Sequence, residues 1–425
     1  MTEPESRRPR IALLHYTTPP VVGGVETVLA QHAHHLALEG FDVRVLTGRG
    51  ESLGAGVRLH RLPLLDSRHL RVLAVARDLE AGRITAAFAA LTAQIRTDLE
   101  RALDGVDVCV AHNALTLHKN LALTAALHQI AARKNRLRLV AWCHDLAWTN
   151  PQYRPHLHAG APWDLLQTGV RGGTYVAVSR ARQQALCVAL GLPGTAVEVI
   201  PNGIDPAAFL RLTGVGRWLA DTLRLWDQQV VLLLPARITR RKQIEYALAV
   251  ASEMVRRELA VRLLVTGPLG AHNPRNRGYL QELRALRRGL GLDEHVVFCA
   301  DLRGPRGRPL GLSDRTMADL YLLADALLLP SRDEGFGLPL LEAGLSRLPA
   351  FTTDLETLRA VGDDAIYTFG LEDAPARVAA AIIDTLMEER GYRLRRRVLA
   401  SYRWSVIMRE QIVPLLTRTT AAVGS

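Results

Sequence analysis

The 425-residue chain has few cysteines and no long apolar run. Its four cysteines, Cys109, Cys143, Cys187 and Cys299, lie far apart and form no C-x-x-C pair, so we expect reduced thiols rather than disulfides. No uncharged apolar stretch approaches the roughly 20 residues that a membrane-spanning helix needs. The first residues are basic but carry too short an apolar core for a secretory signal. These absences predict a cytoplasmic protein.

Aromatic residues are also scarce, at 5% of the chain, and no helix-turn-helix, zinc-finger or aromatic-interleaved basic motif is present. We therefore expect no nucleic-acid partner, although the net charge is +11. The charge favours another anionic partner, such as a nucleotide sugar, a phosphorylated acceptor or an acidic membrane surface. The densest basic cluster, within 393–397, falls in a helical stretch. We expect a solvated helix face there, and peripheral contact with a membrane stays open.

Short apolar runs alternate with stretches of helical periodicity along the whole chain. This alternation is typical of parallel sheets that are covered by helices on both faces. The turn-rich sequence at 201–206 (PNGIDP) divides the chain into two halves, 1–203 and 204–401, and the last strand of the second half is expected at 365–367. The sequence thus predicts an α/β protein with two Rossmann-like, doubly wound domains that face each other across a cleft.

The most informative stretch is 324–343. An apolar strand at 325–329 leads into the glycine-bearing loop SRDEGFG, and a helix with Pro339 in its first turn follows. This order places Glu334 just before the helix and Glu342 about two turns further along. The loop N–H groups then face an anion at the positive end of the helix dipole. Carboxylates suit the hydroxyls of a sugar or ribose, and amides suit a diphosphate.

Three other sites follow strands. The loop TTPPVVGG, which ends at Gly24, opens the first helix; this is a phosphate-binding arrangement, although a bare Gly-Gly is equally typical of a turn. A strand at 137–143 delivers His144 to its carboxyl end, where open α/β sheets bind ligands. Arg237 and Lys242 lie five residues apart in a loop after a strand of the second half.

The string EGFGLPLLEAG resembles the donor-site signature of retaining nucleotide-sugar glycosyltransferases of the GT-B fold, the group 1 (family 4) class. Arg237 and Lys242 match that family's R-x4-K pair, and PNGID resembles its PNGVD junction. Trp404 matches the tryptophan of a final helix that crosses back to the first domain, so the resemblance implies that 402–425 packs on residues 1–203. The first loop matches the family's PxxGGxE at Pro20, Gly23, Gly24 and Glu26.

The resemblance implies a GT-B fold and a retaining hexosyltransferase. Such an enzyme would move a mannose- or glucose-type sugar from a nucleoside-diphosphate sugar to a hydroxyl acceptor. The residues implied as catalytic are His144, Arg237, Lys242 and Glu334. The residues implied in donor binding are Gly24, Arg237, Lys242, Glu334, Gly335, Phe336, Gly337, Leu338 and Glu342, with Glu342 on the ribose and Glu334 on the transferred sugar.

The chain contains no D-x-D triplet, the motif by which GT-A glycosyltransferases hold a divalent metal. We therefore expect fixed cations at the diphosphate, no metal ligands and no cofactor. Nothing identifies the acceptor. The loops at 112–119 and 153–158 carry His112, Lys119 and Arg154, and we expect them to form a pocket for an anionic or polyhydroxylated acceptor.

The nucleotide base and the class of activity each have alternatives. The stretch 303–312 departs from the family as an insertion near the expected base site, which leaves the base open. A non-catalytic sugar-nucleotide-binding protein and a sugar-nucleotide epimerase of the same fold are alternatives. A phosphorylase is a further one, but it should carry a pyridoxal-phosphate lysine context that the sequence lacks.

Overall fold

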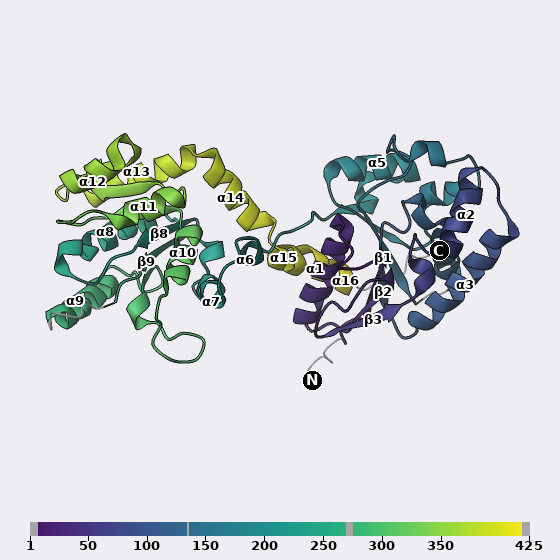
Figure 1. Cartoon of the computed structure of the whole chain (residues 1–425), viewed down its shortest axis with the longest axis horizontal. Coiled ribbons are helices and arrows are strands. Elements are labelled where there is room, and N and C mark those ends of the chain that lie inside the picture. The colour runs from purple at the N-terminus through teal and green to yellow at the C-terminus, as the bar shows by residue number, and fades with distance from the viewer. Residues whose placement is uncertain (1–6, 134–135, 269–274, 419–425) are drawn as a thin grey trace. The chain divides into compact units, whose positions relative to one another are not determined.

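A computed structural model describes residues 7–133, 136–268 and 275–418 of the chain. The chain divides into two compact units (Figure 1). Unit 1 consists of Met1–Ile204 together with Tyr402–Ser425, and unit 2 is Asp205–Ser401. The division between Ile204 and Asp205 lies within the turn-rich junction at 201–206.

Unit 1 is built on a seven-stranded sheet in the order β3-β2-β1-β4-β5-β6-β7. All of its strand pairs are parallel. The order reverses between β1 and β4, and ligands of doubly wound sheets bind at such a switch point. The strands are β1 (Ile11–Thr17), β2 (Val43–Arg49), β3 (Val57–Arg61), β4 (Val108–His112), β5 (Arg138–Cys143), β6 (Thr174–Ala177) and β7 (Val197–Val199).

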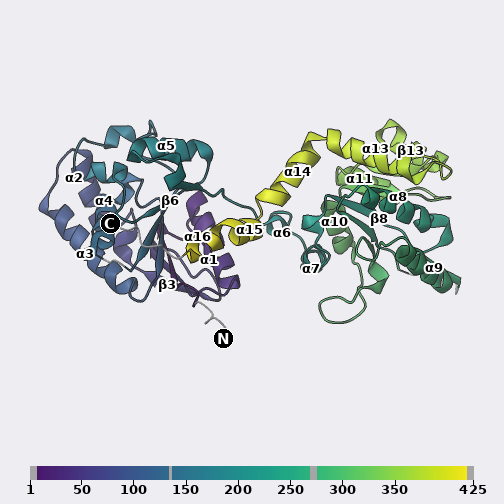
Figure 2. The ribbon, with the colours of Figure 1, turned by 180° about the vertical axis from the view of Figure 1, so that it is seen from behind.

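Helices cover both faces of this sheet (Figures 1 and 2). Ile11 and Leu13 of β1 pack on one face, and Ala12 and Leu14 pack on the other. Because both faces are buried, the strand reads as a continuous apolar run. The first face carries α1 (Gly24–Leu38), α15 (Trp404–Ile407) and α16 (Val413–Thr417); the second carries α2 (Leu70–Glu80), α3 (Ala86–Ala102), α4 (Leu121–Arg133) and α5 (Arg180–Leu190).

Unit 2 repeats the architecture with a six-stranded parallel sheet in the order β10-β9-β8-β11-β12-β13. Its strands are β8 (Val230–Leu234), β9 (Val261–Val265), β10 (Val296–Phe298), β11 (Ala326–Leu329), β12 (Ala350–Thr353) and β13 (Tyr367–Phe369). One face carries α8 (Ile244–Arg256), α9 (Arg275–Gly289) and α13 (Pro375–Glu388). The other carries α7 (Gly214–Thr222), α10 (Asp314–Leu323), α11 (Leu338–Leu345) and α12 (Glu356–Gly362). The switch point lies between β8 and β11.

The predicted α/β class, with two Rossmann-like domains of the GT-B type, is confirmed. One helix was missed and one strand was misplaced. Helix α2, for which no element was predicted, buries Val72, Val75 and Leu79 and leaves Leu70 and Leu73 exposed. The last strand was placed at 365–367 but begins at Tyr367, because this edge strand buries only Phe369 and leaves no continuous apolar run to read.

The chain leaves unit 1 after Ile204 and returns to it at Tyr402, and the backbones of these two crossing segments are hydrogen-bonded to each other. Ile204 N donates to Tyr402 O at 2.8 Å, and Trp404 N donates to Ile204 O at 3.1 Å. Trp404 is buried in the core on the α1 face. A Cβ on Gly203 would lie 2.7 Å from Trp404 Cδ2, so only glycine fits in the turn beside the indole.

The basic cluster of helix α14 (Arg390–Ser401) is only partly a solvated face. Arg396 Nη2 donates to both carboxylate oxygens of the buried Asp325, at 2.6 and 2.7 Å, and Arg395 Nη2 donates to Leu322 O at 2.8 Å. Asp325 also accepts from Val231 N at 2.8 Å, so it joins α14 to strands β8 and β11. Burial raises the pKa of Asp325, and the two arginines oppose that shift. Arg393 and Arg397 are exposed.

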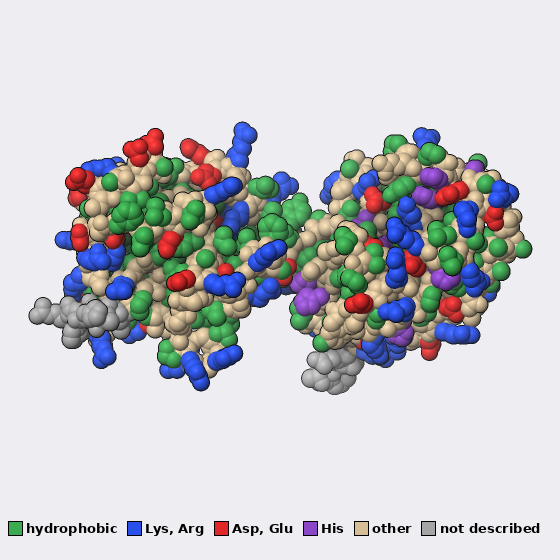
Figure 3. Space-filling model, in the orientation of Figure 1, with side chains coloured by type: hydrophobic (Ala, Val, Ile, Leu, Met, Phe, Trp, Pro, Cys, Tyr) green, Lys and Arg blue, Asp and Glu red, His purple; other side chains and the backbone are tan. Residues whose placement is uncertain are grey.

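Charge elsewhere is dispersed. On the face shown in Figure 3, Lys and Arg side chains are spread over both units, with Asp and Glu among them. Within residues 7–133, 136–268 and 275–418, no helix is both long and apolar enough to cross a bilayer.

The Asp325–Arg396 pair gives a prediction for stability. Arg396→Ala removes the arginine that donates to both oxygens of the buried Asp325 and leaves Arg395 at 3.7 Å, so it should lower the free energy of unfolding of unit 2 by about 3 kcal/mol. Arg397→Ala, one residue along the same helix, removes an exposed guanidinium and should cost less than about 0.5 kcal/mol. Urea denaturation of the two variants measures the difference; equal midpoints would show that the ion pair does not hold α14 to the sheet.

Candidate functional site

The loops after β8 and β11 meet because these two strands are neighbours in the sheet. Lys242 and Glu334, which lie 92 residues apart in the sequence, form a buried ion pair through Nζ and Oε1. Ser331 Oγ donates to the same carboxylate oxygen at 2.6 Å. Arg332 N donates to Arg241 O at 2.7 Å and so ties the two loop backbones together. The fold thus brings two of the candidate catalytic residues into direct contact.

Arg237 lies in the same β8 loop, but its side chain is exposed. Within the described part of the chain, no carboxylate forms an ion pair with it. The backbone beneath it is tightly packed, because a Cβ on Gly267 would lie 1.9 Å from Ala236 O and 2.5 Å from Arg237 Cα. Gly267 was missed by the sequence analysis, although the Gly-Pro dipeptide after strand β9 is a turn signal that could have drawn attention to it.

The β11 loop ends in an open set of donors at the start of α11. Among the described residues, the backbone N–H groups of Gly335, Phe336 and Gly337 have no hydrogen-bond partner. Gly337 adopts the left-handed conformation with φ 96°, and a Cβ there would lie 2.6 Å from Leu358 Cδ2. The side chains of Phe336 and Leu338 are exposed. Free N–H groups at a helix N-terminus suit an anion.

Glu342 lies on the second turn of α11 and is exposed. Its Oε2 accepts a hydrogen bond from the hydroxyl of Tyr321 on α10. Burial, and then the hydrogen bond to the carboxylate, raise the pKa of Tyr321, so the phenol stays a donor. Tyr321 therefore orients Glu342, a role that no local pattern in the sequence indicates.

In unit 1, Gly24 begins α1 directly after the β1 loop, and a Cβ there would meet nothing within 4 Å. The neighbouring Glu26 folds back instead of facing outward: Thr17 Oγ1 donates to its Oε1 at 2.6 Å, and His15 Nε2 lies 3.8 Å from the same oxygen. Burial opposes ionisation of Glu26, but the interactions of the carboxylate with His15 and Thr17 outweigh it and lower its pKa to about 2.

His144 follows β5 and is held at its backbone. Asn113 Oδ1 accepts hydrogen bonds from His144 N at 2.8 Å and from Asp145 N at 3.1 Å. Burial, followed by the charge of His15, lowers the pKa of His144 to about 4. The imidazole is therefore neutral near pH 7.

His112 occupies the end of the neighbouring strand β4. Its Nδ1 lies 3.2 Å from His144 Nε2, and the two rings stack with centroids 5.5 Å apart. The side chain is 0% exposed. We expected His112 to contact the acceptor, but such a buried ring cannot reach one, because strand β4 points it into the core on the α1 side.

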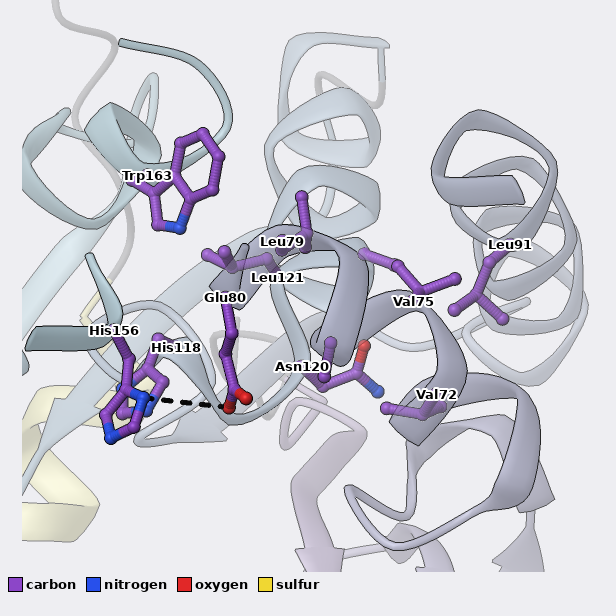
Figure 4. A pocket seen from close by; sticks show the side chains of 12 residues that line it. Val72, Val75, Leu79, Glu80, Leu91, His118, Asn120, Leu121, His156 and Trp163 are labelled. Carbon is purple, nitrogen blue, oxygen red and sulfur yellow. Dashed lines mark ion pairs between the residues drawn. The ribbon is translucent and has the colours of Figure 1, made fainter. Parts of the chain in front are cut away.

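The other acceptor candidates, Lys119 and Arg154, lie next in sequence to His118 and Tyr153; Figure 4 shows His118 beside His156 and Glu80. Lys119 Nζ lies 4.7 Å from the centroid of the Tyr153 ring. His118 and His156 stack at 5.7 Å, and His156 Nδ1 lies 3.8 Å from Glu80 Oε1. Burial and the charges of Lys119 and His156 lower the pKa of His118 to about 4.

This cluster borders a small cavity of about 20 Å³ on the second helical face of unit 1. Arg154 follows Tyr153 and is exposed. The loops expected to form the acceptor pocket, 112–119 and 153–158, therefore do meet within unit 1. Across the described ranges, no group of three or more His, Cys, Asp or Glu side chains is placed to hold a metal ion.

Two family models match the chain. The model of glycosyltransferase family 4 matches residues 22–208, and that of the glycosyl transferases group 1 matches residues 229–388; together they span well over half of the sequence. The chain belongs to the group 1 glycosyltransferases. The first model ends just inside unit 2, and the second lies wholly within it.

Individual relatives of this glycosyltransferase are distant. An uncharacterized glycosyltransferase of Methanocaldococcus jannaschii is 24% identical over 56% of this chain, which spans 58% of that relative. D-inositol 3-phosphate glycosyltransferase of Acidothermus cellulolyticus is 24% identical, covering 88% of this chain and 82% of its own. Among solved structures, sucrose-phosphate synthase from Thermosynechococcus elongatus is 17% identical with a TM-score of 0.38, covering 96% of this chain and 98% of that one.

The loop before α11 gives a prediction. Gly337→Ala places a side chain at a left-handed backbone position and against Leu358, which should lower the free energy of unfolding by about 1–3 kcal/mol. Gly335→Ala is the matched control, because a Cβ at Gly335 meets nothing within 4 Å. Thermal denaturation of both variants measures the effect. A melting temperature for Gly337→Ala equal to that of the control would mean that the loop does not depend on this backbone conformation.

Proposed function

We propose that the protein is a retaining, metal-independent hexosyltransferase, which moves a mannose- or glucose-type sugar from a nucleoside-diphosphate sugar to a hydroxyl acceptor. The observation that carries the proposal is the contact between Lys242 and Glu334 beside the free N–H groups at the start of α11. A cation, a buried carboxylate and unpaired amide donors converge there, and these are the groups that a sugar joined to a diphosphate requires.

Cleavage of the sugar–phosphate bond moves negative charge onto the departing diphosphate. Fixed donors that face this charge are worth more in a preorganised site than in water. In this proposal Arg237 and Lys242 neutralise the diphosphate, and the amides of 335–337 donate to its oxygens. Glu334 Oε1 already accepts from Lys242 and Ser331. Its Oε2 lies 3.7 Å from Arg241 Nη1, beyond hydrogen-bond distance, so Oε2 is the oxygen that receives a sugar hydroxyl. Glu342, oriented by Tyr321, binds the ribose hydroxyls.

Retention of configuration follows from attack on the same face as the leaving group, with the departing phosphate accepting the acceptor's proton. The groups near the switch point of unit 1 support this course. His144 is a weak base, since its pKa is lowered to about 4. The Glu26 carboxylate is engaged by Thr17 and His15 and has a pKa of about 2. Neither group is suited to remove a proton from a sugar hydroxyl near pH 7.

For the acceptor we propose an anionic or polyhydroxylated molecule bound by Lys119 and Arg154. Lys119 is held over the Tyr153 ring, and Arg154 is the next residue in the chain. A relative named for D-inositol 3-phosphate supports this class, because that molecule is both polyhydroxylated and phosphorylated.

The donor site is tested by charge removal. Lys242→Ala and Arg237→Ala should each lower kcat/KM by roughly 10²–10³, as the loss of one transition-state donor does elsewhere. Turnover is measured with the donor that a panel of nucleotide sugars identifies by slow hydrolysis. Arg240→Ala is the control, because Arg240 lies in the same loop but pairs with Glu282 at the surface. Near-normal turnover in both site variants would reject the assignment.

Metal independence is tested by chelation. Activity should survive exhaustive treatment with EDTA, because Arg237 and Lys242 provide the positive charge that a divalent ion would otherwise supply. The measurement is the initial rate before and after treatment. Loss of activity that Mn²⁺ restores would contradict this part of the proposal.

The acceptor site is tested separately. Lys119→Ala should raise the KM for the acceptor roughly 10- to 100-fold, since a charged hydrogen bond contributes roughly 1.5–3 kcal/mol. The KM for the donor should stay unchanged, because the side chains that the proposal assigns to the donor, Arg237, Lys242, Glu334 and Glu342, lie in unit 2. A change confined to the donor KM would place Lys119 outside the acceptor pocket.

A further inference from the structure

His112 is buried among aromatic rings at the switch point of unit 1. Its ring centroid lies 5.2 Å from that of His32, 5.8 Å from that of Trp142 and 5.5 Å from that of His144. Its Nδ1 lies 3.2 Å from His144 Nε2. Its Nε2 is buried without a hydrogen-bond partner, and so is Nε2 of His32. One nitrogen of the His112 ring is therefore paired, and the other is not.

Both members of the His112–His144 pair are neutral near pH 7. Burial, with the charges of neighbouring histidines, lowers the pKa of His112 well below its usual value and that of His144 to about 4. The groups that face the pair are His15 from β1, whose Nδ1 contacts His112 O at 2.9 Å, and Glu26 and His32 from α1. A single proton is therefore shared between two neutral rings, and only one of the rings donates it.

The unpaired nitrogen decides which ring donates. If His144 Nε2 carried the shared proton, His112 would hold its own proton on Nε2, where it has no acceptor. A buried donor left unpaired costs about 1–3 kcal/mol. If His112 Nδ1 carries the proton, His112 Nε2 is a bare acceptor, and unpaired acceptors are tolerated more often than unpaired donors. His112 is then the donor, and His144 Nε2 accepts.

We propose that His112 is a positioning residue that fixes His144 in the tautomer with its proton on Nδ1, so that Nδ1–H is the group offered to the substrate. His144 Nδ1 has no partner within the described residues and is not among the buried unpaired atoms. The backbone of His144 is fixed by Asn113, so both the position and the proton of the ring are set by its neighbours. The assignment of the tautomer does not depend on the proposed function, whereas the role of His144 Nδ1–H toward a substrate rests on it.

The tautomer is measured by nitrogen NMR on protein that carries ¹⁵N-labelled histidine. The His144 ring signals are assigned by their loss in His144→Gln. The wild-type protein should show a protonated Nδ1 and an unprotonated Nε2. A wild-type His144 that is protonated on Nε2 would overturn the proposal without any variant at position 112.

Two substitutions test the role of His112. His112→Phe keeps an aromatic ring but removes the donor, so His144 should revert to protonation on Nε2; an unchanged tautomer would overturn the proposal. His112→Asn keeps an N–H donor near the position of Nδ1 and should retain the Nδ1–H tautomer. In transfer assays, kcat should fall about tenfold in His112→Phe, because roughly one hydrogen bond to the substrate is then misaligned. It should recover in His112→Asn.

Different outcomes would contradict the tautomer of His144 and its contact with the substrate. An altered tautomer in His112→Phe with unchanged kcat would overturn the link to the substrate and leave the tautomer assignment in place. An absence of transfer by the wild-type protein with every nucleotide sugar would count against the proposed function. The NMR result does not depend on turnover, so it decides the role of His112 in either case.

Discussion

Parallel pairing of the strands is the constraint on which both units depend. In a parallel sheet all strands end at the same edge, so the loops that follow neighbouring strands must lie side by side. In unit 2 this joins the loops after β8 and β11, and with them Lys242 and Glu334. In unit 1 the pairing of β4 with β5 sets His112 beside His144. The hydrogen-bond ladder of each sheet therefore determines which side chains meet.

The two groups of candidate residues differ in their electrostatics. The unit 2 group pairs opposite charges, because Lys242 and Glu334 form an ion pair in which both side chains are buried. The unit 1 group loses charge, because burial holds His112 and His144 neutral. One group is suited to stabilise developing negative charge, and the other is suited to donate or accept hydrogen bonds without changing charge.

Much of this could be predicted from the sequence, because the relevant signals are local. Continuous apolar runs marked the buried strands, and the string around Glu334 marked the loop before α11. The contributions of Tyr321 and Gly267 could not be predicted, since each acts across elements that are distant in sequence. The expectation that His112 contacts the acceptor was wrong for a related reason. A residue at the end of a strand can face either the ligand-binding edge or the core, and the packing of α1 over the sheet places His112 in the core.

The return of the chain to unit 1 has a consequence for synthesis on the ribosome. The core on the α1 face includes Trp404, Ile407 and Leu416, which are translated only after all of unit 2. Domains usually fold as units while the chain emerges, the N-terminal one first. Here unit 2 is contiguous and can close its core earlier, whereas the first 204 residues must wait with one face of their sheet incompletely covered. A segment that is made after unit 2 thus completes the core of the unit that was begun before it.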